Sequence, residues 1–171
     1  AEHHGQSSVI TGDEARADVM RWRRLFPAIA IGAGTVIADD PCLTSRLPSG
    51  EWCPRRIILD GKLSSVPETG NLPNVYSDKF SESTVVVTDK ASSVDHIRRA
   101  RLIDKGVTIR ELPLGFGGNY SYPKLREILA EEDLTGVYFE GGAKVAHQML
   151  REKALDYLFW YQSPKTFPNA D

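Results

Sequence analysis

The stretch that decides the fold is AIAIGAGTVIADDPCLTSR, residues 28–46. Its first four residues form an apolar run with β-branched isoleucines, which is typical of a strand buried on both faces. Gly32 and Gly34 interrupt this run, and a helix begins near Thr35 and ends at the Asp-Asp-Pro of residues 39–41. A strand that passes through glycines into a helix presents backbone N–H groups to an anion. We therefore expect the polar loop that follows, up to Arg46, to form half of an active site.

Composition and charge narrow the class of protein. The 171 residues fit one domain with a substantial core. A net charge of −2 gives no electrostatic basis for binding nucleic acid or an anionic membrane. No apolar run approaches the roughly 20 residues of a membrane helix, and no signal-peptide pattern opens the chain. Two cysteines without such a pattern, Cys42 and Cys53, indicate a reduced protein in the cytoplasm. His3 and His4 are interpreted as part of a loose terminus, so no metal site is predicted.

Strand-like runs alternate with helical patterns along the rest of the chain. Strands are predicted at residues 56–60, 84–88, 107–112, 137–140 and 155–161, with a shorter one at 74–76. Helices are predicted at residues 13–26, from 92 or 93 to 105, 122–131 and 143–153, the first with a capping box of Thr11 and Glu14. Residues 47–54, rich in Pro and Gly, are predicted to be a connecting loop. This alternation predicts a three-layer α/β domain, with a largely parallel sheet and helices on both faces.

A second glycine turn has the same form as the first. Glu140-Gly141-Gly142 follows a strand-like run and opens a helix. Because the carboxyl ends of parallel strands meet at one edge of the sheet, the two turns are predicted to face one site. Two such turns favour an extended phosphate-bearing ligand such as a dinucleotide, although neither a G-x-G-x-x-G nor a Walker A motif is present. Glu140 is predicted to point into this cleft, with capping of the next helix as the alternative.

The loop residues also have simpler interpretations. Asp39 and Asp40 are alternatively turn formers, and Arg46 is alternatively an ordinary surface arginine. His96 and His147 lie in predicted helices without partners in motif spacing, so they are interpreted as structural.

These segments together resemble the reductase domain of bacterial riboflavin biosynthesis. That domain is usually the C-terminal half of a bifunctional deaminase–reductase, and it has a dihydrofolate-reductase-like fold. The matching segments are residues 9–12, 15–16, 34–41, 43–44, 46, 56–60, 140–142 and 163–165. They occur in the family's order over nearly the whole chain, and the run G-T-V-x-A-D-D-P-x-L-T-x-R is specific. The family also has a first strand, carrying a lysine, and last strands after Ser-Pro-Lys. We therefore expect residues 1–171 to be a single reductase domain that lacks its first and last strands.

The resemblance implies NADPH-dependent reduction of 5-amino-6-(5-phosphoribosylamino)uracil to its ribitylamino form. It implies Glu140 and Asp39 as catalytic residues. The implied cofactor-binding residues are Val9, Thr35, Asp39, Gly61, Gly142, Ala143, Lys144 and Val145. The implied substrate-binding residues are Ser7, Arg23, Leu43, Arg46 and Glu140, with the two arginines suited to the 5-phosphate. Relatives pair as homodimers, so a homodimer is expected, with a deaminase domain fused outside this chain.

The sequence is also consistent with three other functions. The reductase could act on the undeaminated diaminopyrimidine, or catalyse the dihydrofolate reductase reaction. Alternatively, the chain is a nucleotide-binding module without turnover, because Val9 and Gly61 stand where family members often have tryptophan and serine. Lys62 and Lys90, just beyond strand ends, are the candidates for binding the 2′-phosphate of NADPH.

Overall fold

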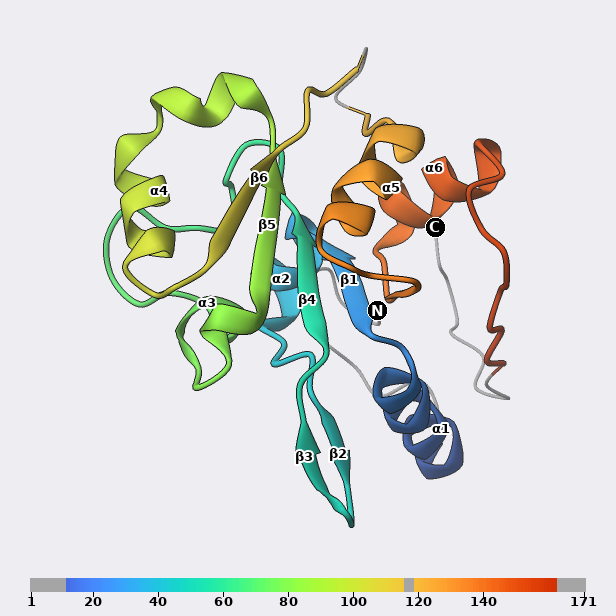
Figure 1. Cartoon of the computed structure of the whole chain (residues 1–171). Coiled ribbons are helices and arrows are strands. Elements are labelled where there is room, and N and C mark those ends of the chain that lie inside the picture. Colours follow the sequence, from blue (N-terminus) through green and yellow to red (C-terminus); the bar gives the residue numbers. More distant parts are fainter. Residues whose placement is uncertain (1–11, 116–118, 163–171) are drawn as a thin grey trace, which may run out of the picture.

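A five-stranded parallel sheet forms the centre of the molecule (Figure 1). The computed structural model describes residues 12–115 and 119–162. The strands are β1 (Ala28–Gly32), β4 (Arg55–Leu59), β5 (Thr84–Thr88), β6 (Thr108–Glu111) and β7 (Val137–Phe139), in the order β6-β5-β4-β1-β7. All residues of β1 and β5 are buried, which explains why these strands are continuous hydrophobic or β-branched runs.

Helices cover both faces of the sheet, as predicted. On one face, α1 (Asp13–Leu25), α2 (Ala33–Asp39), α3 (Asn74–Ser77) and α4 (His96–Ile103) pack against Ile29, Ile31, Ile58 and Val86. On the other, α5 (Tyr122–Glu131) and α6 (Ala143–Arg151) pack against Ala28, Ala30, Ile57 and Val85. Two short 3₁₀ segments, η1 (Ser81–Ser83) and η2 (Lys90–Val94), flank β5. The three-layer α/β class is confirmed.

The order of the strands creates a switch point at β1. The chain builds outward from β1 through β4 and β5 to β6, and then returns to place β7 on the opposite side of β1. The backbone N–H of Glu140 continues the pairing of these two strands by donating to the Ala30 carbonyl at 2.9 Å. In open α/β sheets, ligands bind outside the carboxyl ends of the strands at such a point. The fold therefore places both glycine turns where a ligand is expected.

The predicted loop at residues 47–54 is wrong, because a β-hairpin forms there. The strands β2 (Ser45–Leu47) and β3 (Gly50–Trp52) pair antiparallel and extend away from the main sheet, beside α1 (Figure 1). Gly50 has a φ of +120°, which a residue with a side chain rarely adopts, so the turn requires this glycine. The Ser45 hydroxyl donates to the Met20 carbonyl of α1 at 2.7 Å. The hairpin therefore depends on contacts with α1, which the local sequence pattern does not predict.

Three further short elements differ from their predictions. The predicted strand at 74–76 is the helix α3, because an apolar run of this length does not distinguish the two. The helix predicted from residue 92 or 93 begins at His96, where the Asp95 carboxylate caps it by accepting from the Arg98 N–H at 3.1 Å. Residues 155–161 form no strand, although Phe159 packs against the aromatic rings of α1.

The predicted capping box of α1 falls partly outside the described residues. The residue that caps α1 is Gly12, and no side chain makes a capping hydrogen bond there. Thr11 lies outside the described residues. None of the helices in the described part of the chain is long and apolar enough to cross a bilayer.

Candidate active site

The two glycine turns lie in contact with each other. Gly32 precedes α2 and Gly142 precedes α6. A Cβ atom added to Gly142 would lie 3.5 Å from the Thr35 hydroxyl oxygen, and one added to Gly32 would lie 3.2 Å from a Val145 methyl group. The two turns therefore pack against each other, as the prediction requires; that they face one ligand stays a prediction.

The turn before α6 offers backbone N–H groups to an anion. The N-cap residue of α6 is Gly142, which has no side chain to cap the helix, and residues 141–144 are exposed. The first N–H groups of a helix have no partner within the helix, and the helix dipole favours negative charge there. The nine-residue helix and its glycine approach fit a ligand phosphate. No metal-binding group of three or more His, Cys, Asp or Glu occurs within residues 12–115 and 119–162.

Glu140 forms a bidentate pair with Arg23 beside these turns. The Arg23 Nε donates to Oε1 at 2.7 Å and Nη2 donates to Oε2 at 2.6 Å. Arg23 Nη1 also donates to the Thr44 carbonyl at 2.9 Å. The two side chains are 12% and 22% exposed. Because Glu140 bonds to Arg23 and α6 has no side-chain cap, the helix-capping alternative for Glu140 is wrong.

This pair brings three distant segments together. Arg23 comes from α1, Thr44 from the loop before β2, and Glu140 from the carboxyl end of β7. A guanidinium has five N–H donors in a planar fork, and the described contacts of Arg23 use three of them. The sequence names Arg23 and Glu140 as separate substrate contacts, whereas the structure makes them partners. The role of the Thr44 carbonyl could not be predicted from the sequence, because every residue has a backbone carbonyl.

The loop at residues 39–46 divides into exposed and anchored positions. Asp39 is exposed at the end of α2. Asp40 has a φ of +41°, and its carboxylate accepts from the backbone N–H and side-chain amide of Asn74 at 2.7 and 2.8 Å. The turn-forming alternative therefore holds for Asp40. Arg46 is exposed in β2 and pairs in register with Glu51 of β3.

Leu43, one of the expected substrate contacts, is buried. Its side chain is only 2% exposed and packs in the core, and its φ is +55°. A contact between Leu43 and a ligand is thus left to its backbone. Ser7 and Val9 lie outside the described residues.

The residues that follow β4 are mainly buried and contribute to packing. Asp60 is 2% exposed, and its carboxylate accepts four hydrogen bonds, from the backbone N–H and hydroxyl groups of Ser64 and Ser65. Gly61 lies against Leu114, whose methyl carbon would come within 2.5 Å of an added Cβ. Lys62 and Lys90 are exposed near the carboxyl ends of β4 and β5.

The fold and the site together define an α/β domain with two glycine turns and an Arg23–Glu140 pair at the carboxyl ends of β1 and β7. A family model described as the RibD C-terminal domain matches residues 1–169, and the chain belongs to this family. The family resemblance deduced from the sequence motifs is confirmed.

Individual relatives agree with this assignment. The riboflavin biosynthesis protein RibD of Bacillus amyloliquefaciens is 36% identical over 164 residues, which cover 96% of this chain and 42% of that protein. Among solved structures, RibD of Acinetobacter baumannii matches 99% of this chain and 45% of its own, with 27% identity and a TM-score of 0.63. A Thermotoga maritima protein, described as a diaminohydroxyphosphoribosylaminopyrimidine deaminase/5-amino-6-(5-phosphoribosylamino)uracil reductase, matches 82% of this chain and 35% of its own, with 29% identity and a TM-score of 0.58. The chain thus spans less than half the length of these relatives.

Proposed function

We propose that this domain reduces 5-amino-6-(5-phosphoribosylamino)uracil to its ribitylamino form with NADPH. The observation that carries the proposal is the position of the Arg23–Glu140 pair directly after β7, next to the two glycine turns that contact each other. A polar group that can hold a sugar and a backbone turn that can hold a phosphate therefore share one edge of the sheet. The name of the Thermotoga maritima relative supports the choice of substrate.

The cofactor side of the site is formed by the turns. NADPH supplies a hydride when bound, and the protein's part is to bind and orient it. The N–H groups at the start of α6 suit its phosphates, because Gly142 has no Cβ to block their approach. The residues proposed for this side are Val9, Thr35, Asp39, Gly61, Gly142, Ala143, Lys144 and Val145.

The substrate side is formed by the charged groups. Glu140 is the proposed catalytic carboxylate, together with Asp39, and Arg23 holds Glu140 in one orientation through two parallel hydrogen bonds. The exposed guanidinium of Arg46 suits the 5-phosphate of the substrate. Ser7 and the backbone of Leu43 complete the proposed set.

The chemistry needs positioning more than covalent catalysis. The open-chain ribose presents C1 as an imine; a hydride adds to this carbon, and a proton adds to the nitrogen, which gives the ribitylamino group. Holding two reactants in one geometry and excluding water account for much of such a rate enhancement. A carboxylate held rigidly by an arginine can fix the sugar hydroxyls for this transfer.

We propose that the domain is completed by strands outside the described residues. Among the described strands, β7 pairs only with β1, so its other edge is open. A largely apolar groove of about 630 Å³ runs along β7, between α5, α6 and residues 154–159. A groove that borders an open strand edge suits an added strand, because pairing would satisfy the edge N–H and C=O groups. The coverage of 42% of a relative also fits fusion to a deaminase domain.

Assembly and location are proposed on separate observations. Tyr157, Leu158 and Trp160 are 82%, 63% and 79% exposed, and such a patch of large apolar side chains is typical of an interface. We propose a homodimer that uses this patch. Cys42 and Cys53 are free thiols, which fits the reducing cytoplasm.

The test of function is NADPH oxidation by the full-length protein with the deaminated and the undeaminated pyrimidine. We expect turnover with the deaminated compound, and a loss of turnover in Arg46→Ala but not in Arg21→Ala, which removes another exposed arginine. Faster turnover of the undeaminated compound would reverse the proposed reaction order. Tight NADPH binding without turnover of either compound would show a binding module instead.

A further inference from the structure

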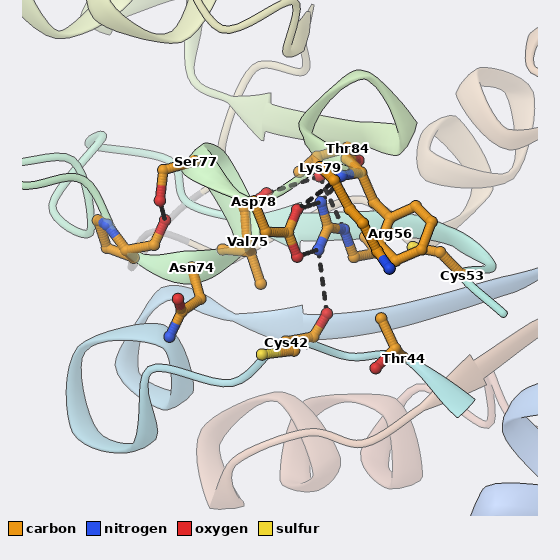
Figure 2. A network of polar contacts seen from close by, with 12 residues as sticks. Cys42, Thr44, Cys53, Arg56, Asn74, Val75, Ser77, Asp78, Lys79 and Thr84 are labelled. Atoms are coloured by element: carbon orange, nitrogen blue, oxygen red, sulfur yellow. Dashed lines mark hydrogen bonds and ion pairs between the residues drawn. The ribbon is translucent and has the colours of Figure 1, made fainter. Parts of the chain in front are cut away.

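Arg56 is a fully buried arginine whose five N–H groups all have partners. Nε donates to the Thr84 hydroxyl, while Nη1 and Nη2 form a fork with the Asp78 carboxylate at 2.8 and 2.9 Å. Nη2 also donates to the Phe80 carbonyl at 2.7 Å. The fifth bond runs from Nη1 to the Cys42 carbonyl at 3.0 Å (Figure 2). The side chain is 0% exposed.

The Cys42 bond differs from the other four in its target. Asp78, Phe80 and Thr84 belong to the α3–β5 connection and the start of β5, and they already neutralise and satisfy the guanidinium. Cys42 instead lies in the loop that joins α2 to β2 (Figure 2). Arg56 therefore ties this loop to the sheet.

The tethered loop adopts a costly backbone conformation. Asp40 and Leu43, on either side of Pro41 and Cys42, have φ values of +41° and +55°. Residues with a Cβ adopt this left-handed region at a cost, which is smaller for aspartate than for leucine. The enforcing contacts are the Asn74 bonds to Asp40 and the Arg56 bond to Cys42.

The same loop reaches the proposed active site two residues later. The Thr44 carbonyl accepts from Arg23 Nη1 at 2.9 Å, and Arg23 holds both carboxylate oxygens of Glu140. A shift of the loop at Cys42 would move the Thr44 carbonyl, and Arg23 would then be free to turn. A continuous series of hydrogen bonds and chain therefore joins Arg56 to Glu140.

We propose that Arg56 is a positioning residue for the substrate side of the active site, acting through the Cys42 carbonyl and the Thr44–Arg23–Glu140 contacts. This inference rests on the proposed function. It assigns Arg56 no contact with substrate or cofactor. The glycine turns and Thr35 are not part of this series of contacts, and Asp39 only borders the loop, so the effect falls more on pyrimidine binding than on NADPH binding.

The test compares Arg56→Lys with Arg55→Lys in the full-length protein. Lysine retains the charge but not the planar fork, so Arg56→Lys cannot keep all five bonds. Arg55 is the matched control: it precedes Arg56 in β4, and it donates to the Glu82 carbonyl, Thr108 and Glu132 without contacting the loop. Both variants lose hydrogen bonds of an arginine, and both are expected to unfold more easily.

The two variants are expected to differ in two measurements. In Arg56→Lys, amide hydrogen exchange of residues 40–46 becomes faster. KM for the pyrimidine rises about tenfold, as expected for weakening a bond to a charged group, while KM for NADPH changes less. In Arg55→Lys, neither measurement changes. Equal exchange in Arg56→Lys and wild type, or the same acceleration in both variants, would overturn the proposal.

The exchange measurement separates this inference from the proposed function. If the wild-type protein turns over neither pyrimidine, the function fails, but loop exchange still decides whether Arg56 holds the loop. If Arg56→Lys does not fold, Asp78→Asn serves instead, because it removes one charged acceptor and lets the guanidinium reorient. Faster exchange at residues 40–46 is then expected, and unchanged exchange overturns the proposal.

Discussion

Two arginine–carboxylate pairs in this molecule have similar bond lengths and different surroundings. Arg56 and Asp78 form a fork with bonds of 2.8 and 2.9 Å, and Arg23 and Glu140 form one with bonds of 2.7 and 2.6 Å. Arg56 is fully buried, and its five donors all have partners within the protein. Arg23 is 12% exposed, and three donors are used within the described residues.

The difference shows how to distinguish a structural pair from a pair available to a ligand. A guanidinium whose five donors are all bound has no donor left for a further partner. Removing its carboxylate partner leaves the arginine charge buried without a counterion. The two carboxylates are almost equally exposed, 20% for Asp78 and 22% for Glu140, so the arginines make the difference. A pair whose arginine has donors remaining can bind one more polar group. The distances alone do not separate the two pairs; the number of donors used and the exposure of the two arginine side chains do.

The largest expected effect is on stability, from breaking the buried pair. Asp78→Ala leaves the Arg56 charge without its counterion, which costs about 3 kcal/mol in the free energy of unfolding. Urea denaturation measures this loss. Glu140→Ala is the comparison, and we expect a much smaller loss because its partner Arg23 is partly exposed to water. Equal losses in the two variants would remove the distinction between the pairs.

The next effect is on catalysis, from changing the partly exposed pair. Glu140→Gln keeps the shape but removes the charge that Arg23 and the substrate contact, so kcat/KM for the pyrimidine is expected to fall about 30-fold, or about 2 kcal/mol. Steady-state kinetics measure it. Glu131→Gln, at an exposed position of α5, is the control and should keep the wild-type value. A wild-type kcat/KM in Glu140→Gln would contradict the assignment of this carboxylate.

A smaller effect tests the cofactor side. Gly142→Ala puts a methyl group 3.5 Å from the Thr35 hydroxyl without straining the backbone, because the φ of Gly142 is −64°. We expect the Kd for NADPH to rise by about fivefold, or about 1 kcal/mol, with unchanged stability. Fluorescence titration measures Kd. Gly136→Ala, just before β7, is the matched control, since the atoms nearest to its Cβ would belong to the Phe26 ring and Pro27. Equal Kd values in the two variants would count against the turn as the cofactor site.

The smallest expected effect is a pH dependence at a third carboxylate. Burial raises the pKa of Glu132, but hydrogen bonds and charge from Arg55 and Arg110 outweigh it, so the pKa lies below its usual 4.5. A carboxyl group with a lowered pKa in the folded state stabilises the protein above its unfolded pKa, and that contribution is lost as pH falls. The stability difference between wild type and Glu132→Gln should therefore be constant above about pH 4.5 and shrink below it. Urea denaturation at several pH values measures this difference, and a difference that does not shrink would contradict the lowered pKa.

Long buried runs made most of the fold predictable. The strands β1 and β5 are buried at every residue, so their sequences are apolar or β-branched throughout. The helix α5 has the predicted bounds, and Leu125, Ile128 and Leu129 are buried as their spacing requires. Short elements were not predictable in this way. The hairpin β2–β3 and the helix α3 depend on contacts with Met20 and Asp40, which belong to other parts of the chain.

Within the site, the sequence identified residues but not their relations. The motifs named Arg23, Glu140 and Arg46 individually. The bond between Arg23 and Glu140 spans 117 positions, and no local pattern carries such information. The burial of Leu43 was not predicted for a related reason. The sequence around a leucine in a polar loop does not show whether its side chain packs into the core or faces a ligand.

The sequence by itself determined the α/β class, the two glycine turns and the family, because each depends on residue types in order along the chain. Only the tertiary structure decided which charged groups are saturated and which remain available. Hydrogen bonding is a competition among all groups that the fold brings within about 3 Å of one another. Arg56 meets five acceptors in the interior and Arg23 meets three near the surface, and that difference separates the scaffold from the candidate site.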